Sequence, residues 1–327
     1  MNAFRSLFAV CAGFALSTIA IAQPAWKPEH TVEMIVPTAA GGGNDKTARV
    51  LNRIWQAMGV QTTVSNRTGG GGAAAYTYLN LRKGDAHYLS IAQAGLFTNH
   101  ITGRSAVNYT DFAIIANLGN EPSALAVRAD SPFKSAQELF ERMKQDPQAV
   151  SISIGSTPGG TSHMALARAY RTAGADPKRL KIVSFNGSAE SVTAVLGGHI
   201  DGMIAAINNV VPHVNAGKMR ALFVTSPQRL TGDFANVPTL RELGLDVVQT
   251  GWTVVMGPKG VPAAPVRYWE DLLVKSVQHE DWQTYRLANY WDDRVTRSAD
   301  TQHYLAREYE AAKRVLTDLG LAAAAKQ

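Results

Sequence analysis

Segments with the residue pattern of β-strands alternate with helical segments along most of the chain. Residues 31–37, TVEMIVP, alternate as a strand does, and residues 46–55, KTARVLNRIW, then repeat apolar residues at helical spacing. The same succession recurs at residues 150–156, VSISIGS, and 161–174, TSHMALARAYRTAG. Strands separated by helices of about ten to fifteen residues indicate βαβ units and a mostly parallel sheet. The sequence therefore predicts an α/β fold, and its 327 residues are enough for two domains.

Three of the predicted strand-to-helix loops are rich in glycine or hydroxyl groups. They are residues 38–45, TAAGGGND, residues 155–163, GSTPGGTSH, and residues 186–190, NGSAE. Ligands of open α/β sheets lie at the carboxyl ends of strands, where such loops are found. A helix N-terminus also has unpaired N–H groups and a positive dipole end, which suit a carboxylate or phosphate. The alternative is a merely tight turn, with Asn44 or Asp45 as the first helix's N-cap.

The first 22 residues have the organisation of a secretory signal peptide. MNAFRS carries a positive charge, LFAVCAGFALSTIAIA is apolar, and Ala20 and Ala22 form a small-x-small cleavage site. Cleavage is expected after Ala22. The only cysteine, Cys11, lies inside this segment, and a lipid anchor there would need a small residue in place of Val10. The mature protein is therefore expected to have no thiol, which excludes disulfides and cysteine metal sites.

Charge and motifs argue against several other classes of protein. The net charge is +6, but the basic residues are scattered, unlike a nucleic-acid footprint. No later stretch is long and apolar enough to span a membrane, so the mature protein is not expected to be membrane-embedded. Residues 68–75, TGGGGAAA, contain G-x-G-x-x-A but lack the acidic residue that dinucleotide binding needs further along. No nucleotide, other cofactor or nucleic acid is therefore predicted as a partner.

Enzymatic signatures are also missing from the sequence. There is no G-x-S-x-G motif, and no histidines pair as H-x-x-x-H, so neither a hydrolase triad nor a metal site is predicted. His163 directly follows Ser162, and adjacent residues rarely form a productive dyad. Carboxylates from distant segments could still meet. Trp252, Trp269, Trp282 and Trp291 are expected to pack in the core, although Trp252 could also reach a cleft.

Seven blocks, in order along the chain, resemble those of the Bug family, the periplasmic solute receptors of tripartite tricarboxylate transporters. The blocks are IVPTAAGGGND, VSNRTGGGG, ISIGSTPGGTSHMA, FNGSAESVTAVLGGHIDGM, HVNAGKMRALFVTSPQR, NVPTLRELGL and GWTVVMGPKGVP. The resemblance covers nearly the whole mature chain. It implies a two-lobed, Venus-flytrap fold of the type II periplasmic binding class, no enzymatic activity, a small carboxylate as ligand and a two-component membrane permease as partner. A periplasmic monomer, secreted through the cleaved signal peptide, is expected.

The resemblance also implies where the lobes divide and where the ligand binds. The chain is expected to cross between lobes at residues 123–129 and 219–226. Lobe one would then contain residues 26–124 plus 227–327, and lobe two residues 125–226. The residues expected to line the ligand site are Thr38, Ala40, Gly41, Asn44, Gln93, Gly95, Thr157, Thr161, Ser162, His163 and Ala205.

The chain departs from the usual family pattern at three places. Thr38 replaces an aromatic residue, and Asn186 replaces a lysine, which favours a smaller or less anionic ligand. Ala205 lies where an acidic residue is common, and its loss argues against an amino acid ligand. Two alternatives to a transport receptor stay open: an enzyme on the same scaffold, with His163 as the titratable group, and a sensor that docks to a membrane signalling protein.

Overall fold

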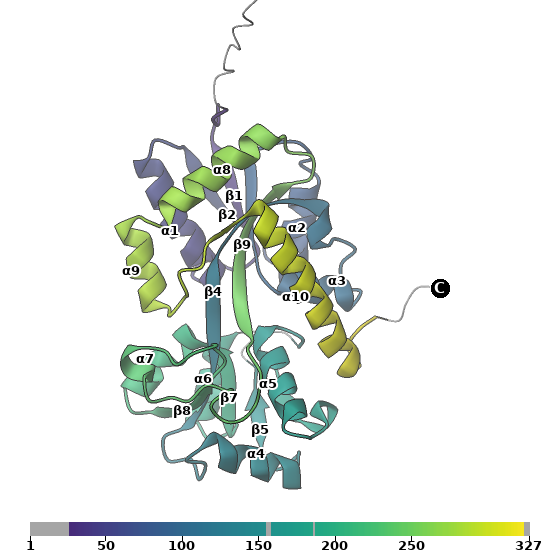
Figure 1. Ribbon diagram of the computed structural model, residues 1–327, viewed down its shortest axis with the longest axis vertical. Coiled ribbons are helices and arrows are strands. Elements are labelled where there is room, and N and C mark those ends of the chain that lie inside the picture. The colour runs from purple at the N-terminus through teal and green to yellow at the C-terminus, as the bar shows by residue number, and fades with distance from the viewer. Residues whose placement is uncertain (1–25, 155–157, 186, 324–327) are drawn as a thin grey trace, which may run out of the picture.

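One long strand, β4 (Phe112–Arg128), belongs to two sheets. The structure is a computed structural model that describes residues 26–154, 158–185 and 187–323. Two lobes lie one above the other, and β4 runs between them (Figure 1). The predicted two-lobed α/β fold is confirmed. The predicted signal peptide, its cleavage site, Cys11, Asn186 and Thr157 lie outside the described residues.

The sheet of lobe one places its parallel strands so that they end near lobe two. Its order is β2–β1–β3–β9–β4. β1 (Val32–Val36) is parallel to β2 (Thr62–Asn66) and to β3 (Tyr88–Ala92). β9 (Thr250–Pro258) is antiparallel to both β3 and β4, so β3 has the same direction as β4. Because β4 runs from lobe one into lobe two, the carboxyl ends of β1 and β3 face lobe two. A short β10 (Thr296–Arg297) also pairs with β4.

The sheet of lobe two has the opposite orientation. β7 (Gly202–Ala206) and β8 (Met219–Val224) are antiparallel to β4. β5 (Ser151–Ser153) is parallel to both β7 and β6 (Lys181–Val183). The carboxyl ends of β5, β6 and β7 therefore face lobe one. The loops that follow the parallel strands of both lobes meet in the space between the lobes, where open α/β sheets bind ligands.

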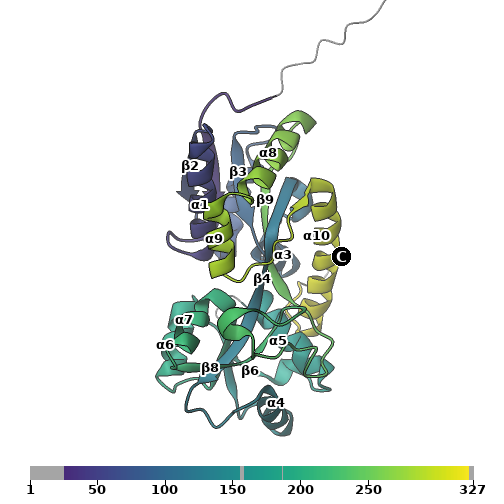
Figure 2. The same ribbon diagram turned by 60° about the vertical axis from the view of Figure 1, so that its left-hand side comes forward.

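Helices cover both faces of each sheet, and the buried side chains form four apolar clusters. In lobe one, α1 (Gly43–Ala57), α8 (Ala263–Ser276) and α9 (Glu280–Ala288) pack on one face. The other face carries α2 (Ala73–Asn80), α3 (Gly95–Ile101) and α10 (Ser298–Asp318). In lobe two, α4 (Ala136–Gln145) and α5 (Thr161–Thr172) pack opposite α6 (Ser188–Leu196) and α7 (Val211–Asn215). Figure 2 shows α10 beside the hinge region, extending from lobe one towards α5.

The four tryptophans of the C-terminal third are core residues, as predicted. Trp269 and Trp282 are fully buried, and Trp252 and Trp291 are 3% and 5% exposed. Trp252 packs against Phe97 of α3 with ring centroids 4.9 Å apart, so its side chain belongs to the core of lobe one.

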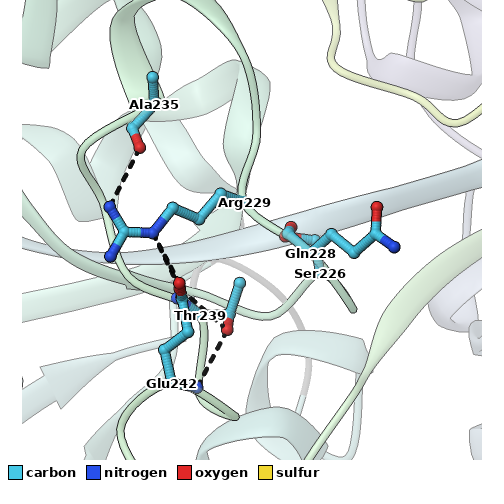
Figure 3. A network of polar contacts seen from close by, with 6 residues as sticks. All are labelled: Ser226, Gln228, Arg229, Ala235, Thr239 and Glu242. Carbon is cyan, nitrogen blue, oxygen red and sulfur yellow. Dashed lines mark hydrogen bonds and ion pairs between the residues drawn. The ribbon is translucent and has the colours of Figure 1, made fainter.

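The segment from residue 225 to residue 249 packs on lobe two. Phe234 and Leu240 are fully buried in the clusters of that lobe. Arg229 Nε donates to both carboxylate oxygens of Glu242, at 2.8 and 3.0 Å (Figure 3). Thr239 and Glu242 cap each other, because Thr239 N donates to Glu242 Oε2 at 2.9 Å and Glu242 N donates to Thr239 Oγ1 at 3.2 Å. The blocks VTSPQR and NVPTLREL therefore form one structural unit.

The paired strands indicate where the chain passes between the lobes. β4 pairs with β9 as far as Pro122 and with β7 from Ser123 onwards. β8, which covers most of the expected return crossing at 219–226, pairs with β4 inside lobe two. The chain then stays on lobe two until Gln249, whose N–H donates to Thr225 O at 3.2 Å. On this packing we propose that lobe two comprises residues 123–249 and that β9 makes the return crossing.

Candidate functional site

The loop between β1 and α1 is held by one buried carboxylate. Asp45 is 1% exposed and accepts hydrogen bonds from Gly41 N (2.8 Å), Asn66 Nδ2 (2.9 Å) and Arg49 Nε (2.8 Å). Burial by itself would raise the pKa of Asp45, but these hydrogen bonds outweigh it and hold the pKa below its ordinary value. The amide of Gly41 is therefore occupied by the protein. Asp45 secures the loop from inside the first turn, and the N-cap is Gly42 rather than Asn44 or Asp45.

The start of α1 is open on the side facing away from this carboxylate. Gly42 has no side chain that could accept a hydrogen bond from the first turn of α1. The backbone N–H groups of that turn therefore lack a capping side chain at this position. A Cβ added to Gly43 would have no atom within 4 Å. Thr38 Oγ1 and Asn44 Oδ1 are buried and have no hydrogen-bond partner among the described residues. The loop therefore combines free space, uncapped amides and two polar atoms that a ligand could satisfy. Ala40, on the same loop, is exposed.

The start of α5 in lobe two has a similar construction. Its N-cap, Gly160, also lacks a side chain that could cap the helix. Ser162 Oγ lies 3.2 Å from Ser123 Oγ on β4, so this hydroxyl is engaged with the hinge strand. Thr161 lies closer to β9, since a Cβ added to Gly251 would be 3.9 Å from Thr161 Oγ1. The amino end of α5 thus lies beside the two strands that join the lobes.

His163 positions the loop that precedes α5. Its Nδ1 accepts a hydrogen bond from Gly159 N at 2.9 Å, and the residue is 6% exposed. Burial lowers the pKa of His163 to about 4, so the ring is neutral at pH 7. The Gly159 carbonyl in turn accepts from Thr98 Oγ1 of α3 at 3.1 Å. His163 therefore connects α5 to a loop that contacts lobe one, and it adds no positive charge to the site.

The buried histidine predicts a specific loss of stability in acid. Its folded pKa of about 4 lies below the ordinary 6.5, so the unfolded chain takes up the proton first as pH falls. The folded state should therefore lose about 2–3 kcal/mol between pH 7 and pH 4.5 because of this group. His163→Asn retains an acceptor near the Nδ1 position without the titration. Urea unfolding of both proteins at the two pH values checks this. Equal pH dependence would contradict it.

The remaining predicted site residues have different surroundings. Gln93 Nε2 donates to Thr253 Oγ1 at 3.3 Å, at the carboxyl end of β3. Gly95 begins α3 and lies against the glycine turn at residues 69–72. A Cβ added to Gly95 would lie 2.8 Å from Gly71 O. Ala205 is buried in the core of lobe two and pairs with Ala124. Their contact with a ligand stays a prediction.

Sequence reasoning missed Glu121, which lies on β4 at the hinge. Glu121 is partly exposed, yet its Oε1 is buried and has no hydrogen-bond partner within the described ranges. Burial raises the pKa of Glu121 to about 8, and the Trp291 indole nearby opposes this shift without forming a hydrogen bond of normal geometry. The signal in the sequence was an acidic residue inside a long strand, in LGNEPSALAV.

Contacts between the lobes flank this hinge on both sides. On one side, Asn208 Nδ2 after β7 donates to Asn289 Oδ1 after α9 at 3.2 Å. On the other side, Arg171 of α5 forms an ion pair with Asp318 of α10. Both lobes therefore contribute contacts on each side of the hinge strand that carries Glu121. A large hollow of about 1470 Å³ beside Trp26 and Tyr268 lies at the opposite edge of the lobe-one sheet, where the strands begin, and none of these groups lines it.

Comparison with known proteins identifies the family. The tripartite tricarboxylate transporter family receptor, TctC, matches residues 48–321. The chain belongs to this family. Protein BugT of Bordetella pertussis is 30% identical over 270 residues, which cover 80% of each protein. The predicted resemblance to the Bug family is confirmed. The family match begins after the β1–α1 loop, so the role of that loop is argued from its geometry.

Solved structures of this receptor class share the fold. A TctC solute-binding protein from Polaromonas, solved without ligand, is 26% identical, with a TM-score of 0.73 and coverage of 89% of this chain and 99% of that one. An R. palustris protein solved with adipate is 23% identical, with a TM-score of 0.78 and coverage of 90% and 99%. Within the described part of this receptor, none of the helices is both long and apolar enough to cross a bilayer. No group of three metal-ligating side chains is placed to hold an ion in the same residues.

Proposed function

We propose that this receptor captures a small organic carboxylate between its lobes and delivers it to a two-component membrane permease. The observation that supports this most strongly is a pair of uncapped helix starts, those of α1 and α5, one in each lobe. Both follow parallel strands whose carboxyl ends face the interlobe space. Membership of the tricarboxylate receptor family supports an acidic ligand and a permease partner.

Helix ends alone bind an anion too weakly for a receptor. Each end stabilises an anion by about 0.3–1 kcal/mol, or ~2 kcal/mol when partly buried. Micromolar affinity needs about 8 kcal/mol. The remainder must come from direct hydrogen bonds in a closed cleft without water, for which Thr38, Asn44 and Thr161 are the candidates. Closure would occur by a hinge movement at β4 and β9.

The receptor is expected to act as a periplasmic monomer without turning over its ligand. The predicted signal peptide at residues 1–22 supports secretion across the inner membrane. His163, the candidate for an enzyme's acid or base, uses Nδ1 to hold Gly159 and is neutral. Its observed role is structural, which favours binding over catalysis. A sensor that uses the same closure would bind the same ligand, so the gene's neighbours or a reconstituted permease must separate sensing from transport.

A thermal-shift screen of small carboxylates tests the proposed function. A ligand that binds only the folded protein, present at 100 times its Kd, stabilises it by about 2.7 kcal/mol. The melting temperature should therefore rise by several degrees for at least one mono-, di- or tricarboxylate. The matched amides, which have the same shape without the charge, should cause no shift. Stabilisation by neutral sugars and by no acid would contradict the proposal.

A further inference from the structure

Glu121 lies on the face of the hinge strands that borders the ligand region. It is paired directly with Gly251 of β9, and directly opposed residues of antiparallel strands project to the same face. Gly251 has no side chain, so it presents none to the Glu121 side chain. A Cβ at Gly251 would lie 3.6 Å from Glu121 O and 3.9 Å from Thr161 Oγ1 of α5. The backbone of Glu121 is thus close to the start of α5.

The same carboxyl group is also a neighbour of α9, which packs on α1. Tyr285 of α9 lies near Glu121, and the negative charge of that carboxylate adds to the effect of burial in raising the pKa of Tyr285 to about 12. Tyr285 Oη is 2.9 Å from Thr47 Oγ1, in the second turn of α1. Trp291 lies along the same stretch of β4, since its ring is 3.6 Å from a Cβ placed on Gly119, two residues before Glu121. Tyr285 therefore links the surroundings of Glu121 to α1.

A purely structural role leaves the chemistry of Glu121 unexplained. A buried carboxylate normally has a cation or several donors as partners, because burying an unpaired charge is costly. Glu121 Oε1 has neither within the described segments, and Trp291 Nε1 is unpaired as well. No ion pair involving Glu121 occurs among those residues either. The neighbouring Trp291 indole makes no hydrogen bond of normal geometry to this carboxyl group, which is therefore suited to a partner that the ligand brings.

We propose that Glu121 determines ligand specificity by accepting the ammonium group of a zwitterionic ligand, whose carboxylate is held by the helix starts. The ligand class would then be an amino acid or a related amino carboxylate. This inference rests on the proposed function. The sequence-based argument against such ligands depended on the missing acid at Ala205. Glu121 supplies an acid on the neighbouring strand, three residues from Ala124, the pairing partner of Ala205.

Matched ligand pairs that differ only by the ammonium group test this proposal. Calorimetry at pH 7 would compare succinate with L-aspartate, glutarate with L-glutamate and propionate with L-alanine. The wild-type receptor should bind the amino member of at least one pair about tenfold or more tightly, as expected for a charge-assisted hydrogen bond. Glu121→Gln should lose that preference and bind the acid without nitrogen equally well or better.

Proton release gives a second readout that a merely structural residue would not produce. The carboxyl group is protonated near neutral pH without ligand, because its pKa is about 8. Binding of an ammonium group should expel close to one proton at pH 7, which calorimetry in buffers of different ionisation enthalpy measures. Glu121→Gln should release none. Glu308→Gln is the control, since Glu308 is a partly buried carboxylate of α10 on the Trp252 side of β9.

The possible results distinguish a failure of the role proposed for Glu121 from a failure of the proposed carboxylate capture. If the receptor binds both members of each ligand pair equally, and Glu121→Gln does not change this, the proposed role of Glu121 is overturned. The proposed capture of carboxylates would still stand. A preference for the acid without nitrogen, lost above pH 8 or in Glu121→Gln, overturns it too, because Glu121 would then donate a proton to the ligand. Failure of every carboxylate and amino carboxylate to bind overturns the proposed function itself.

Discussion

Gly43→Asp should abolish carboxylate binding while the protein remains folded. Gly43 is the first residue of α1, its φ is not in the left-handed region, and a Cβ there meets no atom within 4 Å. An acidic side chain in a first helical turn stabilises the helix by about 0.3–1 kcal/mol. The same charge repels a bound anion, since two unit charges 4 Å apart near a protein surface interact by about 4 kcal/mol. Affinity should therefore fall at least about 100-fold.

The matched control for this experiment is Gly43→Asn. Asparagine has nearly the shape of aspartate but no charge, so most of the affinity should remain. Calorimetry with a carboxylate found in the screen, together with a circular dichroism melt, distinguishes lost binding from lost folding. Wild-type affinity in the aspartate variant would show that the ligand does not approach the start of α1.

Asp45→Ala should destabilise the protein and disorganise the β1–α1 loop. The substitution removes the acceptor of Gly41 N, of Arg49 Nε and of one of the two hydrogen bonds of Asn66 Nδ2, whose bond to Thr38 O at 2.9 Å remains. Each lost hydrogen bond contributes about 0.5–1.5 kcal/mol, and an unpaired donor costs more where it is buried. We expect a loss of about 3 kcal/mol in the free energy of unfolding at pH 7. Carboxylate affinity should fall as well, because the loop that begins α1 would no longer be held in place.

Arg49→Met separates this effect from the ion pair on the same carboxylate. The Arg49 side chain is 55% exposed, so its removal should cost less than about 1 kcal/mol. Urea unfolding of the three proteins provides the measurement. The contribution of Asp45 also depends on pH in a known direction. Its folded pKa is depressed, so this stability is present above pH 3.8 and is lost as pH falls further. Similar losses of unfolding free energy in Asp45→Ala and Arg49→Met would refute the role assigned to Asp45.

Local sequence patterns were enough to predict much of the secondary structure. The strand–helix succession at residues 31–55 and 150–174 appears as β1–α1 and β5–α5. These elements follow from the side-chain period and from glycine at the helix starts, which are properties of neighbouring residues. The family blocks predicted the two-lobed fold. The Arg229–Glu242 network shows why two of those blocks occur together, since they form one folded unit.

The lobe division and the roles of single site residues were harder to predict. The family resemblance implied that lobe two ends at residue 226, whereas the packing of Phe234 and Leu240 supports our proposed end at residue 249. An irregular segment without a periodic pattern does not indicate which of two cores receives its few apolar side chains. Likewise, the glycine loop was recognised, but the hydrogen bonds from Gly41 to Asp45 and from Gly159 to His163 were not.

The sequence by itself determined the α/β fold, the family and the glycine-rich loops that precede α1 and α5, because each is read from local patterns of residues along the chain. Only the tertiary structure placed Glu121, Thr161 and Tyr285 at one hinge, since these residues come from three elements that are remote in sequence. Burial then decided their chemistry. A carboxyl group that would be ionised on a surface strand holds its proton near neutral pH when it is buried at the hinge.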